Sequence, residues 1–416
     1  MRAFDSSLRH LQGRLPAAFA AALLAHSVAY AAPDEDQLGK AEGYPVCPRS
    51  LRPEPRCLVG LVSRFDEIFP ARVVERGAWV RPLARAAAEP ALRYRHGNET
   101  GGIDDYLARN RATGLLVVAG DTILVERYQY DRTAAHRMQS YSMAKTVVAM
   151  LVGIAVAEGR IRSVDDLAEA YVPELRDTPY GQTRLRHLLT MSSGVRFSET
   201  YSGFDDVALL GRLSLLGESA GGAATVMPFR TRERPSGERF DYASADTQVL
   251  GLVLRGATGR ALADYLSEKI WQPMGAEADA SWNVDAGGHE VAYVGINATL
   301  RDYARLGMLL ANDGAVAGRQ VIPAAWVRAA TTPSARQFDP GMTGLMLGYG
   351  YQTWIIGGRD REFVLRGLRG QAIYVAPKSK LVMVQTSAGN VATPSTGELL
   401  SLWTGVQRSL AGAPPR

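Results

Sequence analysis

The chain has 416 residues, of which 46% are hydrophobic and 21% are charged, the ordinary balance of a globular protein. This length can bury one large core or two closely packed ones. The net charge is +5, but the arginines alternate with acidic residues, as in "DDYLARNRATG", and form no basic block. A nucleic-acid-binding module is absent from the sequence, so we expect a solvated surface and no nucleic-acid partner.

Residues 1–31 have the pattern of a cleavable signal peptide. Three arginines precede the apolar run "LPAAFAAALLAHSVAYA", which ends in the small-residue pattern Ala29-Tyr30-Ala31. Cleavage after Ala31 would leave the polar start "APDEDQ". The run is short and alanine-rich for a membrane span, and an uncleaved anchor is the alternative. We therefore expect a periplasmic or secreted protein with no stable membrane span after signal removal.

Residues 32–100 are predicted to form an irregular N-terminal extension, because they contain many prolines and arginines and little periodicity. Cys47 and Cys57, the two cysteines of the chain, bracket the loop "CPRSLRPEPRC". In an exported protein, a disulfide that closes a loop of this size stabilises the fold by about 2–3 kcal/mol. We predict this disulfide, with two free thiols as the alternative. Two cysteines without neighbouring histidines are too few for a metal site.

The first regular elements follow after residue 100. The run "TGLLVVAGDTILVERYQY" predicts two strands joined in a hairpin at Ala119-Gly120-Asp121. The run "MAKTVVAMLVGIAVAEG" predicts a helix that ends near Gly159. Apolar residues cover nearly the whole circumference of this helix, so we expect it to be buried on most sides.

Residues from about 160 to 345 are predicted to be mostly helices and loops. Helical period or content marks "DDLAEAYVPEL", "TRLRHLLTMSSG", "ADTQVLGLVLRGATG" and "TLRDYARLGMLLANDG". Strand patterns return in "GYGYQTWII", "QAIYVAP" and "KLVMVQTS", and "TGELLSLWTGVQRSL" predicts a closing helix. Strands at both ends of the region predict an α+β fold: one antiparallel sheet flanked by helices, with a helical second lobe and a cleft between them.

Ser142 and Lys145 form an S-x-x-K pattern at the start of the predicted buried helix. Residues three apart on a helix share a face, so the lysine amine and the serine hydroxyl lie close together. Burial lowers the pKa of an amine toward that of a useful base. Alternatively, Ser142 caps the helix and Lys145 is an ordinary helix lysine. A histidine triad is disfavoured, because no G-x-S-x-G motif is present and His187 has the setting of a packed helix residue.

Two later segments carry further candidate residues. Tyr242 and Ser244 form a Y-x-S pattern in "FDYASADTQ", where a tyrosine beside a buried ammonium can relay protons to a leaving group. Gly367 and Gly370 precede the strand of "GQAIYVAP", and glycine there permits close approach of the backbone to a ligand. The backbone N–H of Leu368 is then a candidate oxyanion donor. Each segment alone also fits an ordinary structural role.

The three motifs in this order resemble the serine β-lactamase and penicillin-binding protein superfamily, in its class C-like esterase branch. Four segments are most similar in sequence to the 6-aminohexanoate-dimer hydrolases: "SYSMAKTVVAMLVGIAVAEGRIRSVDD", "RHLLTMSSGV", "FDYASADTQVLGLVL" and "GQAIYVAP". The resemblance implies a β-lactamase/transpeptidase-like fold for residues 101–416. It also implies Ser142 as the acylated nucleophile, Lys145 as the base and Tyr242 as the proton relay. Backbone N–H groups of Ser142 and Leu368 would form the oxyanion hole, and Tyr201 would contact the substrate amide.

Two departures from the family pattern bear on the substrate. The third motif reads Leu365-Arg366-Gly367, without the lysine that β-lactamases use, and Ser244 stands where many relatives have Asn. Arg366 is a candidate to replace part of the missing charge.

These departures favour a hydrolase of small esters or linear amides that works through an acyl-enzyme. The alternatives are a β-lactamase or D-alanyl-D-alanine carboxypeptidase, or a non-catalytic member that binds peptide or cell-wall ligands. The expected chemistry uses no metal or organic cofactor, and the oligomeric state is left open.

Overall fold

The structure is a computed structural model that describes residues 31–391 and 396–413. The described residues from Ala32 onward form one compact unit. Residues 1–30, which make up nearly all of the predicted signal peptide, lie outside the described range, so cleavage after Ala31 stays a prediction. Within the described residues, we find no helix that is both long enough and apolar enough to span a bilayer.

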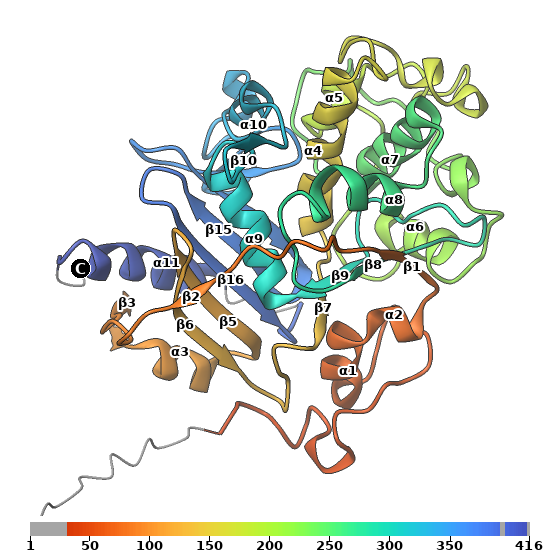
Figure 1. The fold of residues 1–416 in the computed structure, drawn as a ribbon. Coiled ribbons are helices and arrows are strands. Elements are labelled where there is room, and N and C mark those ends of the chain that lie inside the picture. The colour runs from red at the N-terminus through yellow and green to blue at the C-terminus, as the bar shows by residue number, and fades with distance from the viewer. Residues whose placement is uncertain (1–30, 392–395, 414–416) are drawn as a thin grey trace, which may run out of the picture. The chain divides into compact units, whose positions relative to one another are not determined.

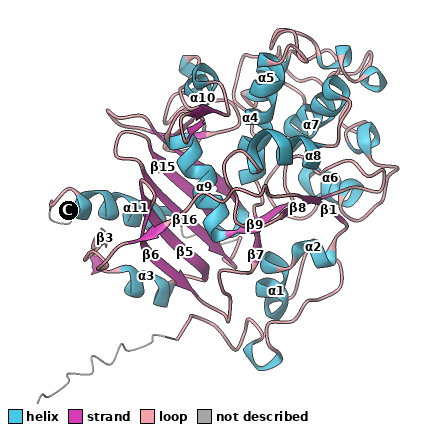
Figure 2. Cartoon of the chain, viewed as in Figure 1, coloured by secondary structure: helices cyan, strands magenta, loops and turns pink. Residues whose placement is uncertain are grey.

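An eight-stranded sheet forms the centre of the fold (Figure 2). The C-terminal strand β16 pairs with the N-terminal strand β5, so that Val384 lies opposite Leu116. All neighbours are antiparallel except β2 and β6, which are parallel. This confirms the predicted α+β class and an antiparallel sheet built from both ends of the domain. In spatial order the strands are β12 (Leu347–Tyr349), β13 (Trp354–Ile356), β14 (Glu362–Gly367), β15 (Gln371–Ala376), β16 (Leu381–Ser387), β5 (Ala112–Ala119), β6 (Thr122–Tyr128) and β2 (Ala84–Arg85).

Alternation along the strands buries both faces of this sheet. On β5, Leu116 and Val118 face the cluster that contains α4 (Met143–Ala157) and α9 (Leu300–Ala311). Leu115 and Val117 face the opposite cluster, which contains α3 (Ile103–Arg109) and α11 (Thr396–Leu410). Figure 1 accordingly draws α9 in front of the strands and α11 behind them. Both hydrophobic faces are therefore covered by helices.

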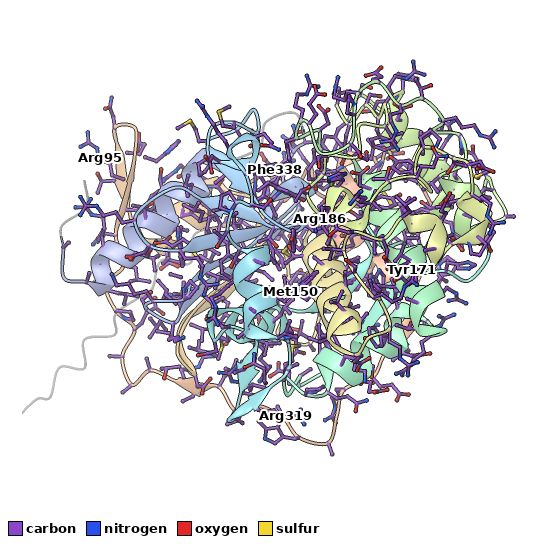
Figure 3. All side chains as sticks on the ribbon, turned by 90° about the horizontal axis from the view of Figure 1, so that it is seen from above. Arg95, Met150, Tyr171, Arg186, Arg319 and Phe338 are labelled. Carbon is purple, nitrogen blue, oxygen red and sulfur yellow. A yellow bond between two sulfur atoms is a disulfide. The ribbon has the colours of Figure 1, made fainter. Side chains whose placement is uncertain are left out.

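Helix α4 is buried as the sequence predicts, and Figure 3 shows Met150 of this helix deep among the other side chains. Helix α10 (Ala324–Ala330) crosses it closely, because a Cβ on Gly153 would lie only 2.3 Å from the Trp326 ring. The Trp326 Nε1 also donates to the carbonyl of Ala149 at 2.9 Å. A helix surrounded on all sides is a rigid support for the residues at its N-terminus.

A second, four-stranded antiparallel sheet leads into the N-terminus of α4. Its order is β1 (Ala71–Val74), β8 (Ala280–Asn283), β9 (Ile296–Thr299) and β7 (Arg137–Gln139). Strand β7 ends three residues before Ser142. The segment 32–100 thus supplies one strand to this sheet (β1) and one to the large sheet (β2). Its other elements are η1 (Lys40–Glu42), η2 (Pro55–Cys57), α1 (Leu58–Ser63), α2 (Phe65–Ile68), β3 (Tyr94–His96) and β4 (Glu99–Gly101).

The helical region differs from the sequence prediction in two places. The segment "DDLAEAYVPEL" forms two short 3-10 turns instead of a helix, because Pro173 lacks an N–H and forces Val172 out of the helical region. The segment "GYGYQTWII" is split into β12 and β13 by a turn in which Gly350 N donates to Thr353 O at 2.9 Å. The remaining elements are η3 (Ala168–Ala170), η4 (Pro173–Leu175), α5 (Leu185–Leu189), α6 (Asp206–Ser214), η5 (Gly222–Thr225), α7 (Ser244–Thr258), α8 (Leu262–Leu266), the π-turn η6 (Ser267–Trp271), β10 (Ala315–Val316), β11 (Arg319–Gln320), η7 (Arg336–Phe338) and η8 (Leu368–Gly370).

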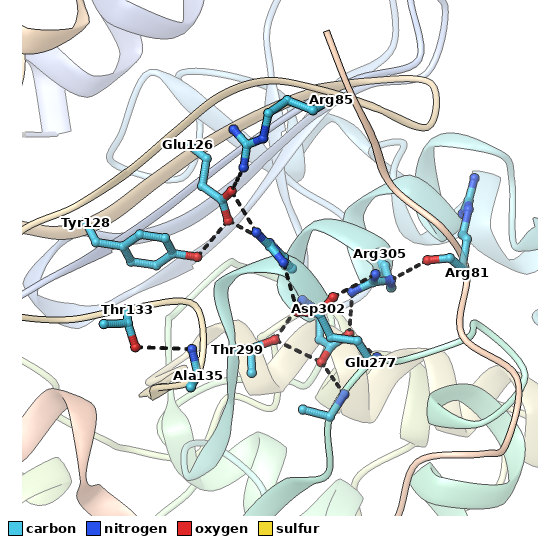
Figure 4. Close-up of polar contacts among 12 residues, drawn as sticks. Arg81, Arg85, Glu126, Tyr128, Thr133, Ala135, Glu277, Thr299, Asp302 and Arg305 are labelled. Carbon is cyan, nitrogen blue, oxygen red and sulfur yellow. Dashed lines mark hydrogen bonds and ion pairs between the residues drawn. The ribbon is translucent and has the colours of Figure 1, made fainter.

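A network of charged residues attaches the segment around β2 to the core (Figure 4). Glu126 on β6 accepts hydrogen bonds from Arg85 and, at 2.7 Å, from Arg301 Nε on α9. Arg305, whose side chain is 2% exposed, bonds the carbonyl of Arg81 at 3.0 Å and Asp302 at 3.0 Å. Buried charges are tolerated when paired in this way. None of these residues lines the pocket described below, so the network is structural.

Candidate active site

The turn before α4 presents Ser142 toward solvent. Tyr141 has a positive φ of 45°, a conformation that costs a bulky residue about 1–3 kcal/mol. The side chain of Gln139 holds this turn by accepting a hydrogen bond from the Tyr141 N–H. Ser142 then takes φ −68° and ψ −3° as the residue that precedes the first turn of α4. Its hydroxyl and its own N–H therefore lie at the helix N-terminus, where the helix dipole favours negative charge.

Lys145 lies one turn further along α4 and points back to this serine. Its Nζ is 2.9 Å from the Ser142 Oγ, 2.9 Å from the Ser244 Oγ and 3.3 Å from the carbonyl oxygen of Tyr293. The residue is 1% exposed, and burial lowers the pKa of the amine from 10.5 to about 8, against an opposing effect of Glu199. All three neighbours are uncharged oxygens. Roughly one tenth of the amine is then neutral at pH 7, far more than for an exposed lysine, which suits a general base.

Tyr242 lies beside both Lys145 and Ser142. The Lys145 Nζ is 5.0 Å from the centroid of the Tyr242 ring, and the ring stacks on Trp354 at 5.5 Å. Burial raises the pKa of Tyr242 well above its usual value, although its hydrogen bond with Ser142 and the charge of Arg366 lower it. The phenol thus stays protonated at neutral pH and can donate a proton next to Ser142.

Glu199 is a member of this cluster that the sequence analysis missed. Its carboxylate accepts from Ser244 N at 2.7 Å, from Ser244 Oγ at 2.9 Å and from the Tyr201 hydroxyl at 2.8 Å. Ser244 opens α7, so Glu199 also occupies the positive end of that helix. A chain of hydrogen bonds therefore runs from Lys145 through Ser244 to Glu199. The family resemblance implied a role for Tyr201, but nothing in the sequence marks Glu199, two residues before it.

The third motif packs against the turn before Ser142. A Cβ on Gly367, at the end of β14, would lie 2.3 Å from the carbonyl oxygen of Ser140. Only glycine therefore lets β14 approach so closely. Leu368 opens the short turn η8 and lines the same pocket as Ser142. Arg366 does not line that pocket, and its guanidinium lies 5.5 Å from the Trp354 ring centroid.

The pocket in front of Ser142 has a volume of about 580 Å³. One wall consists of Ser142, Glu199, Ser244, Tyr293 and Leu368, and the wall from α6 and the residues after it is mostly apolar, with Arg212 as a charged member. A third wall comes from the segment that the sequence analysis treated as an irregular extension. It contains residues 49–53 of the loop between Cys47 and Cys57, together with Leu61 and Phe65.

The loop that forms this third wall is closed by a disulfide and held by specific contacts. Cys47 and Cys57 are bonded, with Cα atoms 5.7 Å apart. The Nη2 of Arg52 donates to the carbonyl of Ser202 at 2.8 Å, and its guanidinium lies 4.3 Å from the centroid of the Phe204 ring. A contact across 150 residues of sequence has no local signature, which is why the sequence analysis did not place this loop at the site.

Alternative chemistries find less support at this site. His187 bonds the Ser236 Oγ at 2.8 Å through Nδ1 and does not line the pocket, so no histidine contacts Ser142 there. In the described parts of the chain, no group of three or more His, Cys, Asp or Glu residues is arranged to hold a metal ion.

Comparison with known proteins agrees with this geometry. The Beta-lactamase family model matches residues 103–401. The 6-aminohexanoate-dimer hydrolase of Paenarthrobacter ureafaciens is 27% identical over 339 residues, which cover 78% of this chain and 84% of that protein. A solved structure from Bacillus anthracis, provisionally described as a 6-aminohexanoate-dimer hydrolase, superposes with a TM-score of 0.75 at 25% identity and covers 86% of this chain and 95% of its own. A family VIII carboxylesterase has the same fold, with a TM-score of 0.55 at 18% identity over 72% of this chain and 93% of its own.

The fold and the comparisons define a serine hydrolase of the amidase and esterase class. The chain belongs to the β-lactamase family, and its relatives include 6-aminohexanoate-dimer hydrolases. The resemblance inferred from the three motifs is thereby confirmed at the level of superfamily and branch.

Proposed function

We propose that this protein is an exported hydrolase of small esters or linear amides that forms an acyl-enzyme on Ser142. The observation that carries the proposal is the 2.9 Å contact between the Ser142 Oγ and the buried Lys145 Nζ, at the wall of a 580 Å³ pocket. A serine hydroxyl becomes an effective nucleophile when a neighbouring base removes its proton. Lys145, with a pKa of about 8, is such a base.

The proposed acylation uses three groups. Neutral Lys145 takes the Ser142 proton while the Oγ attacks the substrate carbonyl carbon. The backbone N–H groups of Ser142 and Leu368 stabilise the oxyanion. When the bond to the leaving group breaks, Tyr242 donates its hydroxyl proton to the leaving oxygen or nitrogen and regains a proton from the Lys145 ammonium.

Deacylation reverses these transfers. Water attacks the acyl carbonyl and gives a proton to Lys145, and the Ser142 Oγ leaves and is reprotonated. Every proton is returned, so the cycle needs no cofactor. Ser244 and Glu199 hold the lysine in place throughout this cycle, and Tyr201 is positioned at the pocket to contact the substrate.

The substrate class rests on two observations. The relative from Paenarthrobacter ureafaciens is a 6-aminohexanoate-dimer hydrolase, which supports linear amides. The third motif has Leu365 where β-lactamases have a lysine, and the neighbouring Arg366 lies beside Trp354, outside the lining of the pocket. We therefore place small esters and linear amides ahead of β-lactams.

Export is supported by the N-terminal signal pattern and by the disulfide between Cys47 and Cys57. Disulfides persist in oxidising compartments such as the periplasm. Localisation of the full-length chain by fractionation, with N-terminal sequencing of the mature form, tests this part of the proposal. A mature start at Ala32 is expected, and a cytoplasmic, unprocessed product would contradict export.

A fluorophosphonate probe tests the nucleophile directly. We expect labelling of the wild-type protein and none of Ser142→Ala, with labelled Ser142 found by peptide mass spectrometry. A panel of short-chain esters, linear amides including 6-aminohexanoate dimer, and penicillins then ranks substrates. Absence of both labelling and turnover would favour a binding-only protein, whereas turnover of penicillins above esters would favour a β-lactamase.

A further inference from the structure

The pocket in front of Ser142 carries an excess of unpaired positive charge. Four arginines line it, and one of them, Arg212, is paired with Glu218 at 3.1 Å. Within the described residues, Arg49, Arg52 and Arg369 form no ion pair with any carboxylate, and their hydrogen bonds go to backbone carbonyls.

The two carboxylates that line the pocket are already occupied. Glu199 takes three hydrogen bonds, from the N–H and the hydroxyl of Ser244 and from the hydroxyl of Tyr201. Asp205 takes the N–H and the hydroxyl of Thr200 at 2.7 and 3.0 Å and the N–H of Ala208 at 3.3 Å. Neither carboxylate pairs with the three arginines, and three positive charges outnumber the two negative ones, so an anionic group of a ligand would meet an attractive field at the arginines.

Backbone carbonyls fix the three unpaired arginines in place, but each guanidinium keeps N–H donors that are not used. Arg49 uses Nε to bond the carbonyl of Ile68 at 2.8 Å, and Arg52 uses Nη2 to bond that of Ser202 at 2.8 Å. Arg369 bonds Gly389 O through Nη1, and its buried Nε finds no partner in the described structure. A guanidinium has five N–H donors, so each can still bind a carboxylate.

The two loop arginines and Ser142 line the pocket from different segments of the chain. Arg49 and Arg52 are exposed residues of the disulfide-closed loop, whereas Ser142 lies on a different wall of the same pocket. A carboxylate that contacts the loop therefore belongs to a part of the substrate away from the reacting carbonyl.

We propose that the disulfide loop is an anion-recognition rim, which selects ester or amide substrates that carry a carboxylate at the end remote from the scissile carbonyl. This inference rests on the proposed function and narrows its substrate class. The rim comprises Arg49 and Arg52. Arg369, which follows Leu368 and lies outside the loop, adds to the positive charge of the pocket.

Two pairs of matched substrates test the charge. One pair places it on the acyl side: the para-nitrophenyl monoester of suberic acid and the same ester of suberic acid monoamide. The other places it on the leaving group: para-butyryloxybenzoate and para-butyryloxybenzamide. We expect kcat/KM to favour the acid over the amide by about 10-fold in one of the two pairs, as for one charge-assisted hydrogen bond. The preference should fall as NaCl is raised to about 0.5 M, because salt screens exposed charges.

Substitutions of the loop arginines test whether the rim causes the preference for the acid substrate. In Arg49→Gln/Arg52→Gln the acid-to-amide ratio should approach one, and in Arg49→Lys/Arg52→Lys it should be partly restored. Arg212→Gln is the matched control, since this arginine lines the same pocket but has its own carboxylate partner, and its ratio should stay at the wild-type value.

The outcomes separate this inference from the proposed function. A wild-type enzyme that turns over both members of each pair equally at low salt overturns the rim but leaves the hydrolase intact. An equal loss on acid and amide in the Gln variant shows a packing role and also overturns it. If no ester is hydrolysed and Ser142 is not labelled, the proposed function itself fails.

Discussion

The Nζ of Lys145 lies 2.9 Å from the Oγ of Ser142, and its other hydrogen bonds also go to uncharged oxygens. A buried amine without a carboxylate in contact favours its neutral form. This relationship links the stability of the fold to the chemistry of the site, because the same desolvation that makes Lys145 a base makes its charged form unfavourable.

The pH dependence of turnover follows from this pKa. Because the base must be neutral, kcat/KM for a neutral ester should rise with pH and level off above about pH 8, the pKa of buried Lys145. A pH–rate profile with a non-ionising substrate measures the inflection. Full activity already at pH 6 would contradict Lys145 as the base.

Glu199 is a positioning residue, and it should also influence the pH dependence of turnover through the pKa of Lys145. Its negative charge raises the pKa of Lys145, so Glu199→Gln should move the rising limb to lower pH. It should also lower kcat, since Ser244 loses a charged acceptor at its N–H and its hydroxyl. The matched control is Glu218→Gln, which removes the partner of Arg212 and should leave the inflection unchanged. An unmoved inflection in Glu199→Gln would show that the carboxylate does not act on the lysine.

Lys145→Met should strongly reduce turnover without lowering stability. The methionine preserves most of the side-chain volume, and loss of the base should slow acylation by about 10²–10⁴-fold. Lys145 has a folded-state pKa of about 8, below its usual 10.5, so its charged form opposes folding below pH 8. This cost, roughly 3 kcal/mol, is relieved as pH rises from 8 to 10.5.

Thermal unfolding at pH 7 measures this effect. Lys145→Met should unfold at a temperature no lower than that of wild type, with Ser142→Ala as an inactive control that keeps the lysine. A clear loss of stability in Lys145→Met alone would show that the charged amine is stabilised by its neighbours after all.

Gly367→Ala should inactivate the enzyme by moving the end of β14. The added Cβ would lie 2.3 Å from Ser140 O, so β14 and the Leu368 N–H must shift away from Ser142. Loss of one oxyanion donor typically lowers kcat by about 10²–10³-fold. Gly102→Ala is a suitable control, because the nearest atom to its Cβ is 3.5 Å away. Ester turnover measures both, and retained activity in Gly367→Ala would argue against Leu368 as a donor.

Removal of the disulfide should affect substrate binding more than acylation. Cys47→Ser/Cys57→Ser opens the loop that forms one wall of the pocket and should lower the free energy of unfolding by about 2–3 kcal/mol. Because the loop contacts Ser202 and Phe204, next to the pocket-lining Tyr201 and Gly203, KM for a substrate that fills the pocket should rise. Fluorophosphonate labelling of Ser142 should continue. An unchanged KM in this variant would mean that the loop keeps its position without the disulfide.

Much of the fold was predictable because its signals are local. The hairpin of β5 and β6, the buried helix α4 and the strands β15 and β16 each carry their own period of apolar residues. The errors arose where one residue overrides a period, as Pro173 does, or where a turn interrupts a strand, as Gly350 does. Strand β1 was missed because four residues next to prolines and arginines have no readable alternation.

The sequence alone determined that Ser142 and Lys145 lie three residues apart, and therefore on one face of the helix that begins there. Ser142 and Lys145 therefore meet wherever α4 forms, and their motif could be read directly. Tertiary structure alone decided that Glu199 reaches Ser244 and that the loop between Cys47 and Cys57 closes the pocket. These contacts join segments far apart along the chain, and they depend on how separately folded elements pack, which no local spacing of residues encodes.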